Sequence, residues 1–460
     1  MSGSPFDPSA IRLPEPPARA HFVGIGGVGV SALARMLRAR GHDVSGSDLS
    51  ESAGTRELAA EGVAVAIGHD AANVTGAAVV VTTSAARDDN VELKAAREQG
   101  IPVVKRAALL GLLANDRLCL AVAGTHGKST TCGMAALALE RAGQSPSFAV
   151  GATVRELGTN ARQGSGDVFV VEADEYDYSF LWLRPRVAIV TNIEHDHPDI
   201  FPDFDSVLDA FARFVRGVTP GGQLVIAADD AGCRVLLERF ALPDGVAAVT
   251  FGERDADWTI DPGGVVRGPS GEVFALRLSV PGRHNQRNAL SVLAAASGLG
   301  IDPVALVPGL ESFGGVSRRF ETLADSPALT VVSDYAHHPT EVAATIEAAR
   351  ERFPNRRVLA VFQPHTYSRT RLLLDEFASA LDQADVVVLA DIYRSRETDT
   401  LGVSSSDIAS RMRRRPSLAG SPEDATTVAR RLMRDGDVAL VMGAGDIHQT
   451  AEALAAGDAS

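Results

Sequence analysis

Residues 118–130 read LCLAVAGTHGKST, an apolar stretch followed by a glycine-containing loop and a lysine. The apolar run 118–123 predicts a buried strand, and STTCGMAALALER (129–141) predicts a helix. Where a glycine loop joins a strand to a helix, backbone N–H groups and the helix N-terminus bind phosphate oxygens. The stretch therefore predicts a phosphate-binding loop in a domain with a parallel β-sheet.

This loop supplies the first candidates for a nucleotide site: Gly124, Thr125, His126, Gly127, Lys128, Ser129 and Thr130. Lys128 would contact the β- and γ-phosphates of ATP, and the Ser129 hydroxyl would bind Mg²⁺. The standard G-x-x-x-x-G-K-[ST] motif would place its first glycine at Val122, so this loop is a shorter variant. The alternative is a turn without a ligand. Lys128 is one of only three lysines in the chain, which favours a functional role.

Three successive series of short apolar strands and helical segments extend from this loop in both directions. They predict an α/β fold of three domains. We expect a Rossmann-like N-terminal domain (20–113), a central P-loop ATPase domain with a parallel sheet (114–318) and a C-terminal Rossmann-like domain (319–460). Within the central domain, residues 253–282 predict a small antiparallel insertion. The proline-rich residues 1–19 predict a flexible leader.

Composition excludes several classes of protein. The chain has 460 residues, 45% of them hydrophobic and 22% charged, as in globular proteins with sizeable cores. Its formal net charge of −14 argues against a nucleic-acid partner. Three scattered cysteines predict neither a disulfide framework nor a zinc ribbon. The sequence shows no signal peptide and no membrane span, so we expect a cytoplasmic protein with no membrane partner.

Acidic and histidine side chains follow two further apolar strands. DVFVVEADE (167–175) places Glu172 at the end of a strand, where a nucleotide-bound metal is held in phosphate-loop sheets. TNIEHDH (191–197) ends with His197. No further cluster of Cys or His completes a zinc site nearby, so we expect a role in a site for Mg²⁺ and phosphate. A polar loop with no ligand is the alternative for each histidine.

A second glycine loop lies in the N-terminal domain. GIGGVG (24–29) fits the pattern G-x-G-x-x-G, and Asp48 ends the next predicted strand. Alone, this motif indicates a Rossmann dinucleotide site. Because the same turn serves any diphosphate, it also fits a nucleotide-linked substrate.

Polar motifs follow the apolar strands of the C-terminal domain: DYAHHP (334–339), FQPHTYSR (362–369) and GAGD (443–446). Open α/β sheets bind ligands at the carboxyl ends of their strands. Histidines gathered at these strand ends therefore predict a site, although any single one could be structural.

Taken together, the motifs resemble those of the Mur ligase family, whose members build the peptide stem of peptidoglycan. The resemblance runs from about His21 to the C-terminus, through HFVGIGGVGVSALARML, GTHGKST, EADE, TNIEHDH, RHNQRNAL, SRRF, DYAHHPTE, FQPHTYSR and MGAGD. It implies an ATP-dependent amide-forming ligase that uses ATP and Mg²⁺. The implied reaction joins L-alanine to the lactyl carboxylate of UDP-N-acetylmuramate through an acyl phosphate, giving ADP and phosphate.

The resemblance also implies roles for particular residues. Lys128 would hold the phosphates, Ser129 and Glu172 one Mg²⁺, and His197 a second Mg²⁺. Asn285 and Asn288 would contact adenine, and Arg319 and Asp334 would contact phosphate and ribose. The remaining candidates are the UDP-sugar residues Gly26, Gly27, Gly29 and Asp48, and the amino-acid residues His337, His365 and Arg369.

Alternatives stay open at this point. Tyr176, where the alanine-adding members often have serine, also resembles a recycling ligase that attaches a tripeptide to the same UDP-sugar. A more distant alternative is an NAD-dependent oxidoreductase, which rests on GIGGVG alone and leaves the phosphate loop unexplained. A catalytically silent nucleotide-binding regulator is disfavoured by the intact Lys128, Ser129, Glu172 and His197. The sequence leaves open whether the protein is a monomer or a homodimer.

Overall fold

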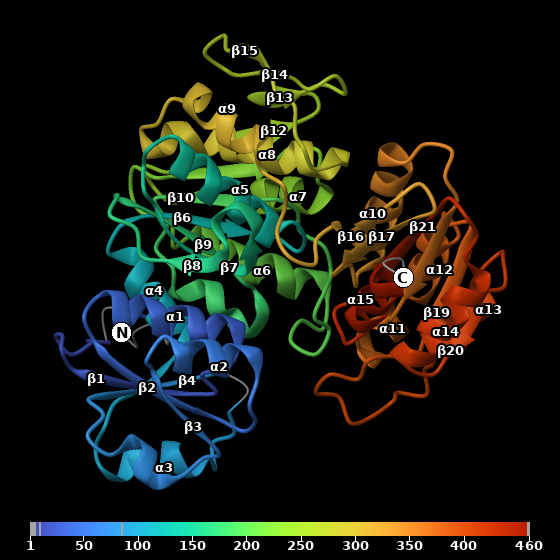
Figure 1. Ribbon diagram of the computed structural model, residues 1–460. Coiled ribbons are helices and arrows are strands. Elements are labelled where there is room, and N and C mark those ends of the chain that lie inside the picture. Colours follow the sequence, from blue (N-terminus) through green and yellow to red (C-terminus); the bar gives the residue numbers. More distant parts are fainter. Residues whose placement is uncertain (1–5, 9–10, 84–85, 458–460) are drawn as a thin grey trace. The chain divides into compact units, whose positions relative to one another are not determined.

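The computed structural model describes residues 6–8, 11–83 and 86–457. It contains three β-sheets, one for each predicted series of strands (Figure 1). The predicted α/β fold is therefore confirmed. The chain forms two compact units: Met1–Glu194 with Phe204–Leu276 and Asn288–Ser312, and His195–Asp203 with Arg277–Arg287 and Phe313–Ser460. The first unit contains the first two sheets and the second unit contains the third.

The first sheet is parallel, with the strand order β3-β2-β1-β4-β5. Figure 1 shows α1 and α2 on one of its faces and α3 on the other. The strands are β1 (Arg19–Val23), β2 (Asp43–Asp48), β3 (Ala64–Ile67), β4 (Val79–Thr82) and β5 (Val103–Lys105). The helices are α1 (Val28–Ala39), α2 (Ala53–Ala60), η2 (Ala71–Val74), α3 (Val91–Glu98) and α4 (Arg106–Asn115).

The second sheet has ten strands in the order β15-β14-β13-β12-β11-β10-β6-β9-β7-β8. Its strands are β6 (Leu118–Ala123), β7 (Ser147–Val154), β8 (Thr159–Arg162), β9 (Val168–Glu172), β10 (Val187–Val190), β11 (Gln223–Ala227), β12 (Ala247–Gly252), β13 (Trp258–Ile260), β14 (Val265–Arg267) and β15 (Val273–Ala275). The predicted insertion is confirmed, because β13, β14 and β15 pair antiparallel at one edge.

The helices that follow these strands are α5 (Lys128–Arg141), η3 (Arg155–Leu157), η4 (Tyr176–Trp182), α6 (Phe204–Val215), α7 (Ala231–Arg239), α8 (Arg283–Ala296), η5 (Ser297–Leu299) and α9 (Pro303–Glu311). The start of α8 at Arg283 could not be predicted from the sequence. Its first turn, RHNQR, is polar and lacks the apolar periodicity that marks a helix. Asn285 and Asn288 therefore lie one turn apart on the same helix.

The third sheet has the order β16-β17-β21-β18-β19-β20 and is parallel except for β16, which the sequence did not predict. Its strands are β16 (Glu321–Asp325), β17 (Leu329–Asp334), β18 (Val358–Phe362), β19 (Val386–Ala390), β20 (Ser417–Ala419) and β21 (Asp437–Met442). The helices are α10 (Pro339–Arg352), α11 (Tyr367–Leu372), α12 (Leu374–Leu381), α13 (Ser405–Arg411), α14 (Pro422–Leu432) and α15 (His448–Gly457).

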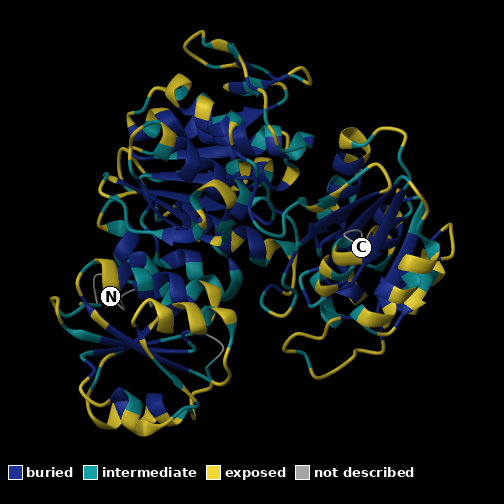
Figure 2. Cartoon of the chain, viewed as in Figure 1, coloured by how far each residue is buried: buried dark blue, intermediate teal, exposed yellow. Residues whose placement is uncertain are grey.

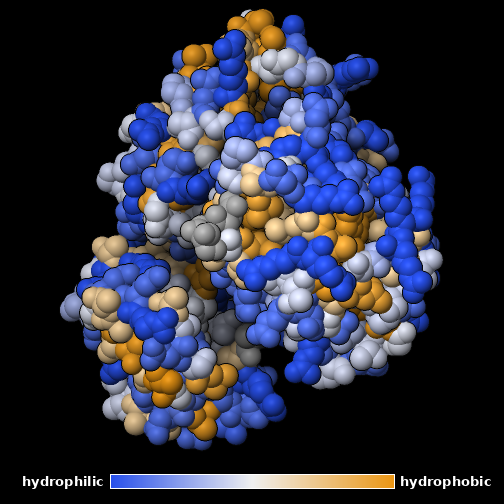
Figure 3. All heavy atoms as spheres, turned by 45° about the vertical axis from the view of Figure 1, so that its right-hand side comes forward, coloured by the Kyte–Doolittle hydropathy of each residue, from blue (hydrophilic) through white to orange (hydrophobic). Residues whose placement is uncertain are grey.

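The cores lie on the sheets, whose central strands are buried (Figure 2). The third sheet carries an apolar cluster on each face, because its central strands have apolar residues at almost every position. The face drawn in Figure 3 is largely hydrophilic, with apolar patches between. No helix in the described part of the chain is long and apolar enough to cross a membrane.

The N-terminal residues only partly test the predicted flexible leader. Residues 1–5 and 9–10 lie outside the described part of the chain. Phe6 packs edge-on against the Trp182 ring, and its carbonyl accepts a hydrogen bond from Arg184. Residues 6–8 therefore lie against the second sheet's domain, and Arg19, the last residue of the predicted leader, begins β1. The flexibility of the leader, like the domain boundaries, stays a prediction.

Candidate active site

The phosphate loop connects β6 to α5 and requires glycine at two positions. Gly124 has φ +136°, and a Cβ atom there would lie 2.0 Å from Oγ1 of Thr191. Gly127 has φ +82°, and its Cβ would lie 2.9 Å from Oδ1 of Asn288. The loop lies directly against the end of β10 and against α8, and its backbone has positive φ angles. For both reasons only glycine fits at these two positions. Asn288 therefore lies against the loop, and its contact with adenine stays a prediction.

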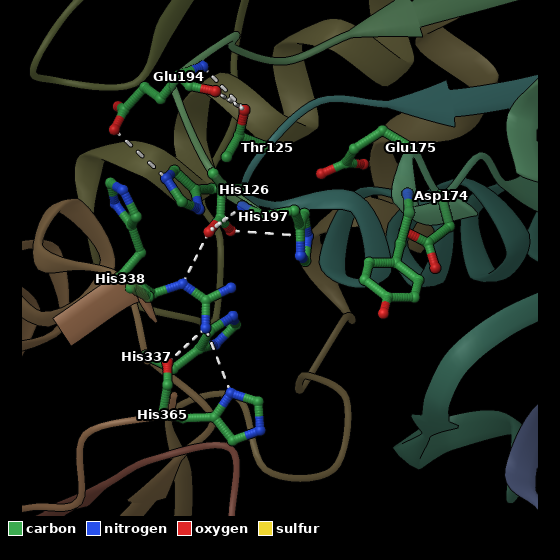
Figure 4. Close-up of polar contacts among 12 residues, drawn as sticks. Thr125, His126, Asp174, Glu175, Glu194, His197, His337, His338 and His365 are labelled. Carbon is green, nitrogen blue, oxygen red and sulfur yellow. Dashed lines mark hydrogen bonds and ion pairs between the residues drawn. The ribbon is translucent and has the colours of Figure 1, made fainter. Parts of the chain in front are cut away.

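The polar residues after β10 hold this loop in place. Asn192 Oδ1 accepts a hydrogen bond from the His126 N–H at 2.8 Å, and Thr191 Oγ1 donates to the His126 carbonyl at 2.6 Å. Thr125 Oγ1 accepts from the Glu194 N–H at 2.8 Å, and the His126 ring lies 3.5 Å from the Glu194 carboxylate (Figure 4). Residues 191–194 therefore position the loop rather than face solvent.

Lys128 is the cation at the centre of the loop. Its Nζ donates to the Gly124 carbonyl at 2.6 Å, to the Thr125 carbonyl at 3.1 Å and to the Glu175 carboxylate at 2.9 Å. The Glu175 side chain is buried and the Lys128 side chain is 13% exposed. Burial alone would lower the pKa of Lys128, but the carboxylates of Glu175, Asp174 and Glu172 raise it above its ordinary value. The loop therefore contains a permanent positive charge.

Glu172 ends β9, which pairs with β6 so that Glu172 lies opposite Val122, just before the phosphate loop. Its carboxylate accepts a hydrogen bond from the Gly151 N–H at 2.7 Å. Ser129 is buried in the first turn of α5, at the other side of the loop. A hydroxyl and a carboxylate are oxygen ligands of the kind that Mg²⁺ prefers, so this donor set fits that ion.

The N-terminal glycine loop is joined to Asp48 by a hydrogen bond within the protein. The Gly26 N–H donates to Asp48 Oδ2 at 2.8 Å, and the Leu49 N–H donates to Oδ1 at 2.8 Å. The loop that carries Gly26, Gly27 and Gly29 is thus bonded to Asp48 through Gly26, and its role in binding the UDP-sugar stays a prediction. Because its carboxylate already accepts these two bonds, Asp48 fixes the loop's conformation.

The second unit brings together His337, His365 and Arg369. Nε of Arg369 donates to Oδ1 of Asp196 at 2.7 Å, and its Nη1 lies 3.2 Å from the His365 ring nitrogen (Figure 4). The His337 and His365 rings meet edge to face at 5.9 Å. Burial lowers the pKa of His337 to about 3 and of His365 to about 4, so both rings are neutral at pH 7.

Asp196 is a functional candidate that sequence reasoning missed. Burial alone would raise its pKa, but Arg369 and His197 hold it well below the ordinary value. His197 follows it with φ +54°, its ring 3.7 Å from the Asp196 carboxylate. The Asp196–Arg369 pair, buried on both sides, therefore fixes the segment that carries His197 within the second unit. The motif TNIEHDH contained this aspartate, but only the fold reveals its arginine.

The other predicted contacts of the second unit are Asp334, Arg319 and Asn285. Asp334, at the end of β17, accepts hydrogen bonds from the backbone of Phe320 and Ala336, and burial raises its pKa to about 6. Arg319 lies 3.5 Å from Glu341 and over the Tyr335 ring. Asn285 donates to the Pro281 carbonyl at 2.7 Å. The structure thus distributes the predicted site residues over both units.

Three sheets built mainly of parallel strands, one of which carries a phosphate loop with a lysine and a strand-end carboxylate, are typical of an α/β enzyme that acts on a nucleoside triphosphate. Comparison with known families narrows this class. The chain matches the Mur ligase family catalytic domain over residues 19–118, the Mur ligase middle domain over 122–296 and the glutamate ligase domain over 318–445. The chain belongs to the Mur ligase family and is an ATP-dependent ligase that forms an amide bond.

Individual relatives agree with this membership. The UDP-N-acetylmuramate–L-alanine ligase of Paenarthrobacter aurescens is 45% identical over 434 residues, which cover 93% of this chain and 94% of that protein. The crystal structure of the UDP-N-acetylmuramate–alanine ligase of Thermotoga maritima is 30% identical, with a TM-score of 0.79 over 96% of this chain and 99% of that one. The murein peptide ligase of Psychrobacter arcticus, 24% identical with a TM-score of 0.71 over 95% and 98% of the chains, shares the fold.

Proposed function

We propose that this enzyme joins L-alanine to the lactyl carboxylate of UDP-N-acetylmuramate, with conversion of ATP to ADP and phosphate. The observation that carries the proposal is the 45% identity over 93% of the chain to an enzyme named for this reaction. The complete phosphate loop supports it, because Lys128 lies where it can contact transferred phosphate.

The chemistry has two steps. A carboxylate oxygen of the substrate attacks the γ-phosphorus of ATP, the bond to the β-phosphate oxygen breaks, and an acyl phosphate and ADP form. The amine of L-alanine then attacks the acyl carbon, loses a proton, and phosphate leaves from the tetrahedral intermediate. The protein needs to position charged groups rather than supply a nucleophile, which fits the buried, inert thiols of Cys119, Cys132 and Cys233.

Ser129 and Glu172 would hold one Mg²⁺, and His197 a second. Bound Mg²⁺ supplies neutralisation of the negative charge on the phosphates. Ser129 and Glu172 fit because both lie beside the phosphate loop in the first unit and offer oxygen atoms.

The remaining site residues keep their expected roles in this proposal. Asn285 and Asn288 contact adenine, Arg319 and Asp334 contact phosphate and ribose, and the loop with Gly26, Gly27, Gly29 and Asp48 binds the UDP-sugar. His337, His365 and Arg369 form the amino-acid end of the site. The lowered pKa values make the neutral rings of His337 and His365 weak bases for the proton that the amine loses. We expect this reaction in the cytoplasm, which fits three free, buried cysteines.

A tripeptide acceptor is the second candidate, and Tyr176 is the residue that favours it. An assay of phosphate release from ATP with UDP-N-acetylmuramate separates the two, with L-alanine and L-Ala-γ-D-Glu-meso-diaminopimelate as alternative acceptors. We expect release with L-alanine, and its loss when Mg²⁺ is chelated. Release with the tripeptide alone would contradict the proposal, and unchanged release without Mg²⁺ would contradict the metal site.

A further inference from the structure

A cavity of the first unit links the N-terminal glycine loop to the carboxylate beside the phosphate loop. On one side it is lined by Gly29, Leu33 and Arg106, from α1 and α4. On the other side it is lined by Gly151, Glu172 and Asp174, from β7 and the end of β9. A single cavity therefore extends from the N-terminal glycine loop to Glu172 beside the phosphate loop. In the proposed reaction, both motifs must contact the same substrate molecule.

Arg106 is the cationic residue of this lining. Across residues 6–8, 11–83 and 86–457, its side chain makes no hydrogen bond and no ion pair. Its Nη1 lies against the glycine loop, where a Cβ atom on Gly29 would come within 3.3 Å. A guanidinium in a cavity with no partner among the described residues has its five N–H donors available to a ligand.

The charges along the cavity are separated. Arg106 is positive at the glycine-loop end, whereas Glu172 and Asp174 are negative at the phosphate-loop end. No ion pair joins Arg106 to either carboxylate. An anionic group of a ligand is therefore favoured at the Arg106 end, and a group that reacts with ATP must reach the Glu172 end.

We propose that Arg106 binds the diphosphate of the nucleotide-sugar substrate. The planar guanidinium matches two phosphate oxygens at once, and its position against Gly29 places it beside the loop that serves diphosphates. The substrate then lies with its diphosphate at Arg106 and its lactyl carboxylate toward Glu172. This inference deepens the proposed function and rests on it.

Calorimetric titration with UDP and with uridine tests the assignment on the full-length protein. Arg106→Ala is expected to weaken UDP binding by roughly 10- to 100-fold, as for loss of a charged hydrogen-bond pair, and to leave uridine binding unchanged. Arg106→Lys keeps the positive charge but loses the planar guanidinium that can contact two phosphate oxygens at once. It should give an intermediate affinity for UDP. The matched control is Lys105→Ala, which removes a neighbouring exposed positive charge outside the cavity and should bind UDP like the wild type.

The outcomes separate this inference from the proposed function. Equal UDP affinity in the wild type and Arg106→Ala would overturn the role of Arg106. Normal UDP binding with weakened UDP-N-acetylmuramate binding would overturn it too, by moving Arg106 to the carboxylate or sugar. Failure of the wild type to bind either nucleotide would instead contradict the proposed function. An equal loss of UDP affinity in Lys105→Ala would also overturn it, because the loss would then reflect the net charge of the protein and not a specific contact of Arg106.

Discussion

At the scale of single residues, Lys128 is the best-defined group of the site. Its three N–H bonds are directed to two loop carbonyls and to Glu175, whose side chain is only 3% exposed. ATP phosphates would have to take the place of at least one of these acceptors. Glu175 therefore holds the ammonium in the loop when nucleotide is absent.

Replacement of Lys128 by methionine should lower the turnover rate by roughly 10²-fold or more, because the positive charge that contacts the phosphates is lost. The same change leaves the Glu175 carboxylate buried without its cation, which should cost about 3–5 kcal/mol of stability. Phosphate release and thermal unfolding measure the two effects separately.

The double variant Lys128→Met/Glu175→Gln is the control for this prediction. Without the second charge it should regain most of the lost stability and remain inactive. Near-normal phosphate release by Lys128→Met would remove the loop from the reaction, whatever its effect on stability.

The sequence predicted individual site residues where a local motif defined their chemistry. Lys128 and Glu172 follow directly from the order of strand, loop and charged residue. Partners from distant segments could not be predicted: Asp196 and Arg369 are 173 positions apart. The hydrogen bond between Asp48 and Gly26 likewise depends on how two strands pair.

At the scale of elements, helix α3 is tied to its sheet by one buried carboxylate. Glu92, in its first turn, is 0% exposed. It accepts hydrogen bonds from Ser47 of β2 at 2.6 Å and from Asn73 of η2 at 2.6 Å, and the His69 ring lies 3.1 Å away. Burial would raise its pKa, but His21, Ser47 and Asn73 together lower it to about 2.

This network predicts a loss of stability in acid. Because the pKa of Glu92 is lower in the folded than in the unfolded protein, its contribution is complete above pH ~4.5 and declines as the pH falls toward about 2. A shift of this size corresponds to roughly 3 kcal/mol. Urea unfolding at pH 3 and pH 6 should show that Glu92→Gln flattens the acid-side decline relative to the wild type.

The matched control for this prediction is Glu98→Gln on the same helix, whose side chain is exposed. It should keep the wild-type pH dependence. An identical acid-side slope for the wild type and Glu92→Gln would refute the role of the buried carboxylate. The burial of this glutamate could not be predicted from the sequence, since polar residues in a first turn usually face solvent.

At the scale of the whole molecule, apolar strands predicted three sheets, because each series of buried strands forms its own core. Which loops belong to which compact unit was not predictable. Residues 195–203 and 277–287 belong to the second unit, although they interrupt the strands and helices of the first. Such membership depends on side-chain pairs such as Asp196–Arg369, which have no sequence pattern.

Two units with separate cores should unfold in two calorimetric transitions. Gly26, Gly29, Asp48 and Arg106 all lie in the first unit, so UDP should raise the temperature of that unit's transition only. At a UDP concentration 100 times Kd the stabilisation is about 2.7 kcal/mol, which for a unit of this size is a rise of about 4 °C. The Arg106→Ala variant at the same UDP concentration is the control and should show a smaller rise. A shift of both transitions, or of the second alone, would contradict a UDP site confined to the first unit.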